Sequence, residues 1–192
     1  MSEPVTTTDE QLLARAGEGD FAAFQQLVSR FQRRVFGLAR RIVGQEQDAE
    51  DVTQQTFLSL LEHLESFRGE SSVATWILKI ATNHALKVLR KRRGLRTVSL
   101  DVPGDDGGSL PHPEYIAQWS RTPQQLLEDA EIQSLVEVAL QELDEKYRLV
   151  FILRDVEGVS TRETAELLDL SESNVKVRLL RARLMLRERL TR

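Results

Sequence analysis

Apolar residues recur at spacings of three and four along most of the chain, on both sides of an irregular middle. This spacing predicts amphipathic helices, because it places the apolar side chains on one face. In the N-terminal half we expect helices over about 9–16, from the break at Gly19-Asp20 through Ile42, over about 47–64, and from a cap at Ser71-Ser72 onward. The expected apolar positions of the last three helices are Phe24, Leu27, Phe31, Val35, Leu38 and Ile42; Val52, Leu60, Leu61 and Leu64; and Trp76, Ile77, Ile80, Ala81, Val88 and Leu89. Four helices with short connections predict a compact bundle.

The helical pattern stops between residues 97 and 123. This stretch holds four of the five prolines, three glycines and several acidic residues, a composition typical of a flexible linker. Helical spacing resumes at Leu126 and continues to the C-terminus, and no stretch predicts a strand of any length. The sequence therefore predicts an all-α protein with two small helical domains, 1–96 and 124–192, joined by an acidic Pro/Gly linker over 97–123.

The composition, 41% apolar and 29% charged over 192 residues, is that of a globular protein. No apolar run approaches the roughly 18 residues of a membrane span, and the N-terminus does not resemble a signal peptide. We therefore expect a cytoplasmic protein without membrane insertion. The chain has no cysteine, and His63, His84 and His112 are scattered without a metal-binding or nucleophile motif. We expect neither an enzyme nor a cofactor.

The net charge of −4 conceals three tracts of opposite sign. Residues 79–96 carry seven basic and no acidic side chains, and residues 171–192 carry seven basic against two acidic ones. Residues 44–66 carry six acidic side chains and no lysine or arginine. Since charge asymmetry is more informative than the sum, the tracts predict two contacts with polyanions and a separate cationic partner.

Residues 161–192 predict a helix-turn-helix. A short helix over about 162–168 ends at Asp169-Leu170, and Ser171 caps a long second helix. Small Ala165 permits close approach of the two helices. The expected core positions of the second helix are Val175, Leu179, Ala182, Leu186 and Leu190, with Leu170 and Val175 filling the angle between the helices.

The opposite face of that second helix carries Asn174, Val177, Leu180 and Arg181, with Lys176 and Arg178 at its flanks. In a major groove, Val177 and Leu180 would contact thymine methyls and Arg181 would pair with guanine, while Ser171 and Ser173 would bind phosphate. The alternative is an αα-hairpin whose basic face is solvated and whose apolar residues pack on another domain.

A second candidate nucleic-acid site precedes the basic tract over 79–96. The segment Phe67-Arg68-Gly69-Glu70-Ser71-Ser72 combines a glycine and small hydroxyl residues beside aromatics, which suits an unstacked base and its backbone. Asn83 offers an amide for a base edge. Trp76 is more typical of core than of a stacking platform, and the run Arg90-Lys91-Arg92-Arg93 also suits a solvated helix end.

In order and spacing, several stretches resemble the extracytoplasmic-function (ECF) sigma factors of RNA polymerase. For the first domain these are DAEDVTQQTF at 48–57, FRG at 67–69 and WILKIATN at 76–83; for the second, LR at 153–154, GVS at 158–160 and SNVKVRLLRAR at 173–183. The resemblance covers nearly the whole chain except the linker. It implies a factor that binds core polymerase, directs it to promoters and assists strand opening.

The resemblance also implies roles for individual residues. Asp48, Asp51, Gln54, Gln55 and Phe57 would dock on the clamp of the largest polymerase subunit. Phe67 through Ser72, with Lys79 and Asn83, would capture a flipped base of the minus-ten element. Ser171, Ser173, Asn174, Lys176, Val177, Arg178, Leu180 and Arg181 would contact the minus-thirty-five duplex. The flap of the second-largest subunit and an anti-sigma protein are further expected partners.

Three positions depart from the family pattern: Gln55 replaces a common glutamate, Lys87 a usual aspartate or asparagine, and Asp144 a frequent proline. Other functions stay open on the residues alone. An autonomous helix-turn-helix regulator would need neither the acidic helix nor the basic bundle, so binding to free core polymerase discriminates it. A sigma-like adaptor would bind core polymerase without opening promoters.

Overall fold

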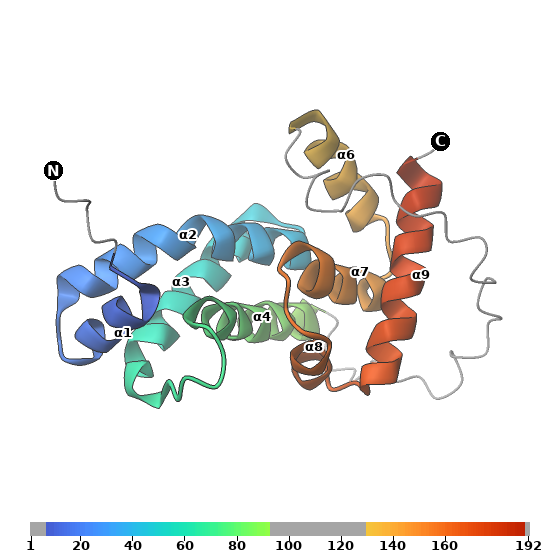
Figure 1. The fold of residues 1–192 in the computed structure, drawn as a ribbon. Helices are drawn as coiled ribbons and strands as arrows, with labels where there is room; N and C mark the ends of the chain where they lie inside the picture. Colours follow the sequence, from blue (N-terminus) through green and yellow to red (C-terminus); the bar gives the residue numbers. More distant parts are fainter. Residues whose placement is uncertain (1–6, 93–129, 191–192) are drawn as a thin grey trace, which may run out of the picture. The chain divides into compact units, whose positions relative to one another are not determined.

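The computed structural model describes residues 7–92 and 130–190, and side chains are described from Val136 onward in the second stretch. Within these ranges all regular structure is helical, so the predicted all-α fold is confirmed (Figure 1). The chain divides after Arg92 into two compact units. The predicted domain limits at 96 and 123, and the linker between them, lie outside the described residues.

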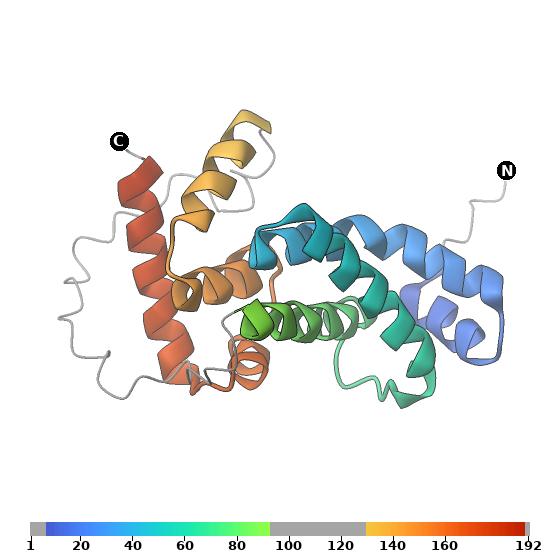
Figure 2. The same cartoon turned by 180° about the vertical axis from the view of Figure 1, so that it is seen from behind.

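The first unit is a helical bundle. Its elements are α1 (Asp9–Gly17), α2 (Phe21–Val43), α3 (Glu46–Glu62), the 3-10 turn η1 (Leu64–Ser66) and α4 (Val73–Arg92). Helices α2, α3 and α4 each pack against the other two, and α1 lies against α2 (Figures 1 and 2). The four predicted helices are therefore confirmed, with ends that differ by a few residues from the expectation.

Local capping explains where these helices begin and end. Thr8 and Gln11 form a capping box at α1, and the Asp20 carboxylate accepts from the Ala23 amide at the start of α2. The amide hydrogen bond and Arg15 hold the pKa of Asp20 below its ordinary value. Helix α2 ends at Gly44, whose φ of 76° is left-handed and favours glycine.

The core of the first unit follows the predicted stripe closely in α2. All six expected α2 positions are buried. In α3, however, Thr56 and Phe57 face inward while Leu61 is exposed, so the expectation for Leu61 is wrong. In α4, Trp76, Ile80 and Val88 are only half-buried. The α4 core is formed by Val73, Ile77, Leu78, Ala81, Thr82, Ala85, Leu86 and Leu89.

The second unit contains α6 (Ala130–Gln141), α7 (Glu145–Phe151), α8 (Thr161–Leu168) and α9 (Glu172–Leu190). Helix α7 continues into a π-helical turn, η4 (Ile152–Val156), where the Glu157 amide donates to the Ile152 carbonyl at 2.9 Å. Helix α9 packs against α6, α7 and α8. Its inner face is therefore the centre of the unit, and each fully buried leucine or isoleucine there contributes roughly 1.5–3 kcal/mol.

Candidate functional site

Helix α3 presents an exposed strip that combines polar and apolar side chains. Asp51, Gln54 and Gln55 are exposed, as a docking role requires. Leu58 and Leu61 extend this strip by further turns and are each 46% exposed. Periodicity alone does not identify these leucines as surface residues, because α3 has apolar residues on more than one face. We call Asp51, Gln54, Gln55, Leu58 and Leu61 the α3 strip.

The family resemblance also implies docking roles for Phe57 and Asp48, but these two residues lie outside the α3 strip. Phe57 is buried with Val52 and Leu60, so its side chain supports α3 from the inside. Asp48 forms an ion pair with Arg92, the last residue of α4. Asp48 thus neutralises a basic residue of its own bundle, and its side chain is 29% exposed.

The loop between η1 and α4 is ordered by contacts at both of its ends. The rings of Phe67 and Trp76 lie 5.2 Å apart at 49°, a tilted aromatic pair. The Ser72 hydroxyl accepts from the Thr75 amide at 3.1 Å and so caps α4, as predicted. Between these anchors, Gly69 has a φ of 70°, and among the described residues no atom beyond its own chain neighbours lies within 4 Å of the position where a Cβ would stand. Arg68 and Glu70 are exposed.

A polar stripe continues from this loop along α4. Thr75, Lys79, Asn83 and Lys87 follow one another at spacings of four, so they share one side of the helix. Asn83 and Lys87 are exposed, and Thr75 and Lys79 are half-buried. The loop at 67–72 therefore leads directly into the helix that carries Asn83, the amide predicted to contact a base. We call Lys79, Asn83 and Lys87 the α4 stripe.

His84 lies beside the α4 stripe and joins α4 to α3. Its Nε2 is 3.0 Å from the Ser59 hydroxyl. Partial burial, reinforced by the nearby charge of Lys87, lowers the pKa of His84 from its ordinary value of 6.5. The side chain is therefore a contact between α3 and α4.

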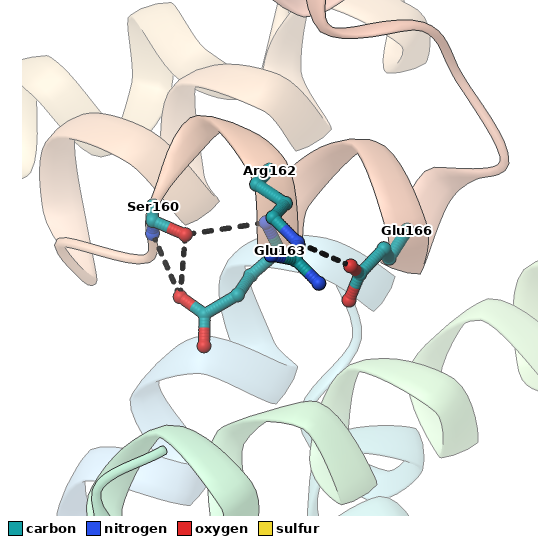
Figure 3. A network of polar contacts seen from close by, with 4 residues as sticks. All are labelled: Ser160, Arg162, Glu163 and Glu166. Atoms are coloured by element: carbon teal, nitrogen blue, oxygen red, sulfur yellow. Dashed lines mark hydrogen bonds and ion pairs between the residues drawn. The ribbon is translucent and has the colours of Figure 1, made fainter. Parts of the chain in front are cut away.

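Helices α8 and α9 form the predicted helix-turn-helix. Figure 3 shows the start of α8, where the Ser160 hydroxyl accepts from the Glu163 amide and the Glu163 carboxylate accepts in return from the Ser160 amide. Helix α8 ends at Asp169, whose φ is 55°. The Ser171 hydroxyl accepts from the Asn174 amide at 3.2 Å, which caps α9 as predicted.

The faces of α9 agree with most of the sequence analysis. Val175, Leu179, Ala182 and Leu186 are buried, whereas Leu190 is exposed and the core expectation for it is wrong. On the other side Ser171, Ser173 and Lys176 are exposed, and Asn174, Val177, Leu180 and Arg181 are half-buried. Arg178 is buried among the core residues of α9. The Arg178 side chain therefore packs in the interior of the second unit. Periodicity placed Arg178 at the edge of the outward face and could not show this burial.

Two arginines of α9 hold it to the rest of the second unit. The Arg183 guanidinium donates two hydrogen bonds of 2.7 Å to the buried carboxylate of Asp155 in η4. This hydrogen-bonded pairing raises the pKa of Arg183 above its ordinary value. Arg181 lies 3.4 Å from the Tyr147 hydroxyl of α7. The orientation of α9 is thus fixed from its polar side as well as from its core.

Within residues 7–92 and 130–190, no cluster of acidic, histidine or cysteine side chains could hold a metal ion. Over the same ranges no helix has the length and apolar character to cross a membrane.

Comparison with known proteins identifies both units. Residues 27–94 match Sigma-70 region 2, and residues 133–186 match Sigma-70, region 4. The chain is similar to the ECF RNA polymerase sigma-E factor of Haemophilus influenzae, with 33% identity over 95% of each chain. It is also similar to the RNA polymerase sigma-H factor of Pseudomonas aeruginosa, with 34% identity over 91% of this chain and 90% of that protein.

Solved structures agree with the fold. The structure of CnrH in complex with the cytosolic domain of CnrY matches with a TM-score of 0.62 and 27% identity, over 95% of this chain and 97% of that one. The sigma factor RpoE of Bartonella quintana, solved with the anti-sigma factor NepR, matches in fold with a TM-score of 0.60 and 24% identity, over 88% and 96%. With both sigma regions matched and relatives similar along nearly the whole length, the chain belongs to the ECF family of RNA polymerase sigma factors, which bind core RNA polymerase and direct it to promoters.

Proposed function

We propose that this sigma factor binds polymerase and promoter DNA through three surfaces. The α3 strip docks on the clamp of the largest polymerase subunit. The loop at 67–72 and the α4 stripe capture an unstacked base of the minus-ten element. The outer side of α9, from Ser171 to Arg181, binds the minus-thirty-five duplex. The observation that carries the proposal is that the loop at 67–72 leads directly into the helix of the α4 stripe, while the α3 strip lies on another helix of the same bundle.

The chemistry of each surface supports its assignment. The α3 strip combines a carboxylate and two amides with two exposed leucines, a composition suited to a protein partner. The α4 stripe offers an amide between two cations, which suits a base edge flanked by phosphates. On α9, the capped N-terminus with Ser171 and Ser173 suits phosphate, and Val177 and Leu180 suit thymine methyls.

Burial separates the residues that can contact a partner from those that support the helix. Phe57 and Arg178 act by holding α3 and α9 in place. Asn83 is the principal candidate for base contact, and the loop of Phe67, Arg68, Gly69, Glu70, Ser71 and Ser72 is the candidate for contact with the base's backbone. The family is not a class of catalytic enzymes. We further propose that the protein has no catalytic activity of its own and acts in the cytoplasm, where polymerase and promoters meet.

Transcription reconstituted with core polymerase tests the three assignments separately. The full-length protein is compared with three variants: Asp51→Ala with Gln54→Ala, Asn83→Ala alone, and Ser173→Ala with Lys176→Ala. We expect the first to lose core binding. The second should form holoenzyme and bind promoters but fail to make the minus-ten element reactive to permanganate. The third should form holoenzyme and lose affinity for duplex promoters.

The matched control is Gln26→Ala, an exposed residue of α2 outside the three surfaces. It should transcribe as the unsubstituted protein does. If Asn83→Ala opened promoters normally, or if the α3 double variant bound core polymerase with unchanged affinity, the assignment of that surface would be refuted. Salt-dependent duplex binding without core binding would instead indicate an autonomous regulator.

An anti-sigma protein is a further proposed partner, which would cover the α3 strip and thereby block docking. The similarity to CnrH, solved with the cytosolic domain of CnrY, supports a protein partner of this kind. The test is competition: a candidate inhibitor should displace core polymerase from the unsubstituted protein. Replacing Leu58 and Leu61 by serine should weaken direct binding of the inhibitor to the sigma factor, measured without polymerase. Unchanged affinity of the inhibitor for that variant would contradict this placement.

A further inference from the structure

Arg92 lies in the basic tract at the end of α4 but makes its contacts inside the first unit. Its Nη1 donates to the carbonyl of Val43 at 2.6 Å, and its Nη2 donates to Oε1 of Gln45 at 2.9 Å. The same guanidinium forms the ion pair with Asp48. One side chain therefore contacts three groups that lie more than forty residues earlier in the sequence.

These three groups mark the corner between α2 and α3. Val43 is the last residue of α2, and its carbonyl is one of those that a helix end leaves without an intrahelical partner. Gln45 is the N-cap of α3 and makes no capping hydrogen bond with its side chain. Asp48 is in the first turn of α3. Arg92 thus satisfies the end of one helix and fixes the beginning of the next.

We propose that Arg92 is a positioning residue that ties α4 to the start of α3, and that it does not contact DNA phosphate. The inference rests on the proposed function, in which α3 docks on polymerase and α4 reads the minus-ten element. Through the fork of its guanidinium, Arg92 sets where the α3 strip stands relative to the end of α4. Asp48 contributes to docking through Arg92 and not by direct contact.

Arg90 provides a matched control, since it lies in the same helical turn, carries the same charge and is exposed. Five full-length variants are compared with the unsubstituted protein: Arg92→Gln, Arg92→Lys, Asp48→Asn, Arg90→Gln, and the double variant that combines Arg92→Gln with Asp48→Asn. Two quantities are measured at a temperature where circular dichroism shows each variant folded. They are the Kd for core polymerase and the slope of log promoter affinity against log salt concentration.

We expect Arg92→Gln and Asp48→Asn each to weaken core binding about three- to tenfold, because both release the start of α3. Combining them should be no worse than Arg92→Gln alone, since Arg92→Gln already removes the contact with Asp48. The salt slope should not change for either. Arg92→Lys keeps the charge but cannot contact all three groups at once, so it should recover only part of the core affinity. Arg90→Gln should leave core affinity unchanged and reduce the salt slope by about 0.9.

A role limited to stability would lower the unfolding temperature and leave the Kd of the folded variants unchanged, and that result would overturn the proposal. The proposal would also be overturned if Arg92→Gln left core affinity unchanged and reduced the salt slope as much as Arg90→Gln does. That result would make Arg92 a phosphate contact. If Asp48→Asn weakened core binding further in the Arg92→Gln background, Asp48 would contact polymerase directly. If the unsubstituted protein did not bind core polymerase, the proposed function would fail together with this inference, whereas normal binding with no effect of Arg92→Gln would refute the inference alone.

Discussion

Replacing Asp155 by asparagine should loosen helix α9 without changing the shape of the side chain. In the native protein the Asp155 carboxylate accepts two hydrogen bonds of 2.7 Å from Arg183. Asparagine can accept one of them, but its amide group would place a donor opposite the other guanidinium donor. The substitution therefore removes a charge and converts a matched bidentate pair into a mismatched one.

The expected loss of stability depends on how exposed the Asp155 and Arg183 side chains are. The Asp155 side chain is 7% exposed, whereas that of Arg183 is 44% exposed. A hydrogen bond to a charged group contributes about 1.5–3 kcal/mol, but water can solvate the released guanidinium and recover part of this loss. We expect Asp155→Asn to destabilise the second unit by about 1–2 kcal/mol, a factor of roughly 5–30 in the opening equilibrium.

Amide hydrogen exchange in the full-length protein measures this effect locally. Peptides that cover η4 and the middle of α9 should exchange faster by that factor, and peptides from α2 should exchange unchanged. Glu166→Gln is the control, since it breaks the Arg162–Glu166 pair of Figure 3, whose side chains are 81% and 55% exposed. An exposed pair of this kind contributes about 0.5 kcal/mol or less. Equal exchange in the two variants would refute the argument that burial makes the Asp155 pair the stronger one.

Three further substitutions test single features of the structure. Because the pKa of His84 lies below 6.5 in the folded protein, the unfolded chain binds the proton more readily. The His84 contribution to stability is therefore fully present above pH 6.5, and the free energy of unfolding decreases as the pH is lowered below 6.5. His84→Gln should flatten this dependence in urea titrations from about pH 7.5 to 5. Thr164→Val should be neutral or stabilising by up to about 1 kcal/mol in thermal unfolding, since the buried Thr164 hydroxyl has no hydrogen-bond partner within the part of the chain that the structure describes. A clear loss of stability would reveal such a partner. Gly44→Ala should cost about 1 kcal/mol in urea unfolding, because alanine is strained at a φ of 76°, whereas unchanged stability would mean that the turn relaxes.

Much of the fold could be predicted because its determinants are local. The break at Gly19-Asp20, the Ser72 cap of α4 and the Ser171 cap of α9 each involve residues within three positions of one another, and all three are present. The six-residue stripe of α2 is equally short in range. A helix with one strongly apolar face has a single favourable orientation, so its buried positions follow from periodicity.

The same periodicity failed where a helix has apolar residues on more than one side. In α3 it did not distinguish the buried Phe57 from the exposed Leu61, and in α9 it placed Arg178 at the surface and Leu190 in the core. Which of two neighbouring positions faces inward depends on the helices packed against it. That information is not contained in the spacing along one helix.

The sequence by itself determined the helices, their caps, the helix-turn-helix and the resemblance to ECF sigma factors, since all of these depend on residues close together along the chain. Only the tertiary structure decided which charged side chains pair with one another inside each unit. It pairs Asp48 with Arg92 and Asp155 with Arg183, and so assigns to internal contacts three residues that the sequence presents as parts of charged tracts, together with Asp155. The physical reason is that an ion pair depends on distance in space, and these partners are 44 and 28 residues apart along the chain.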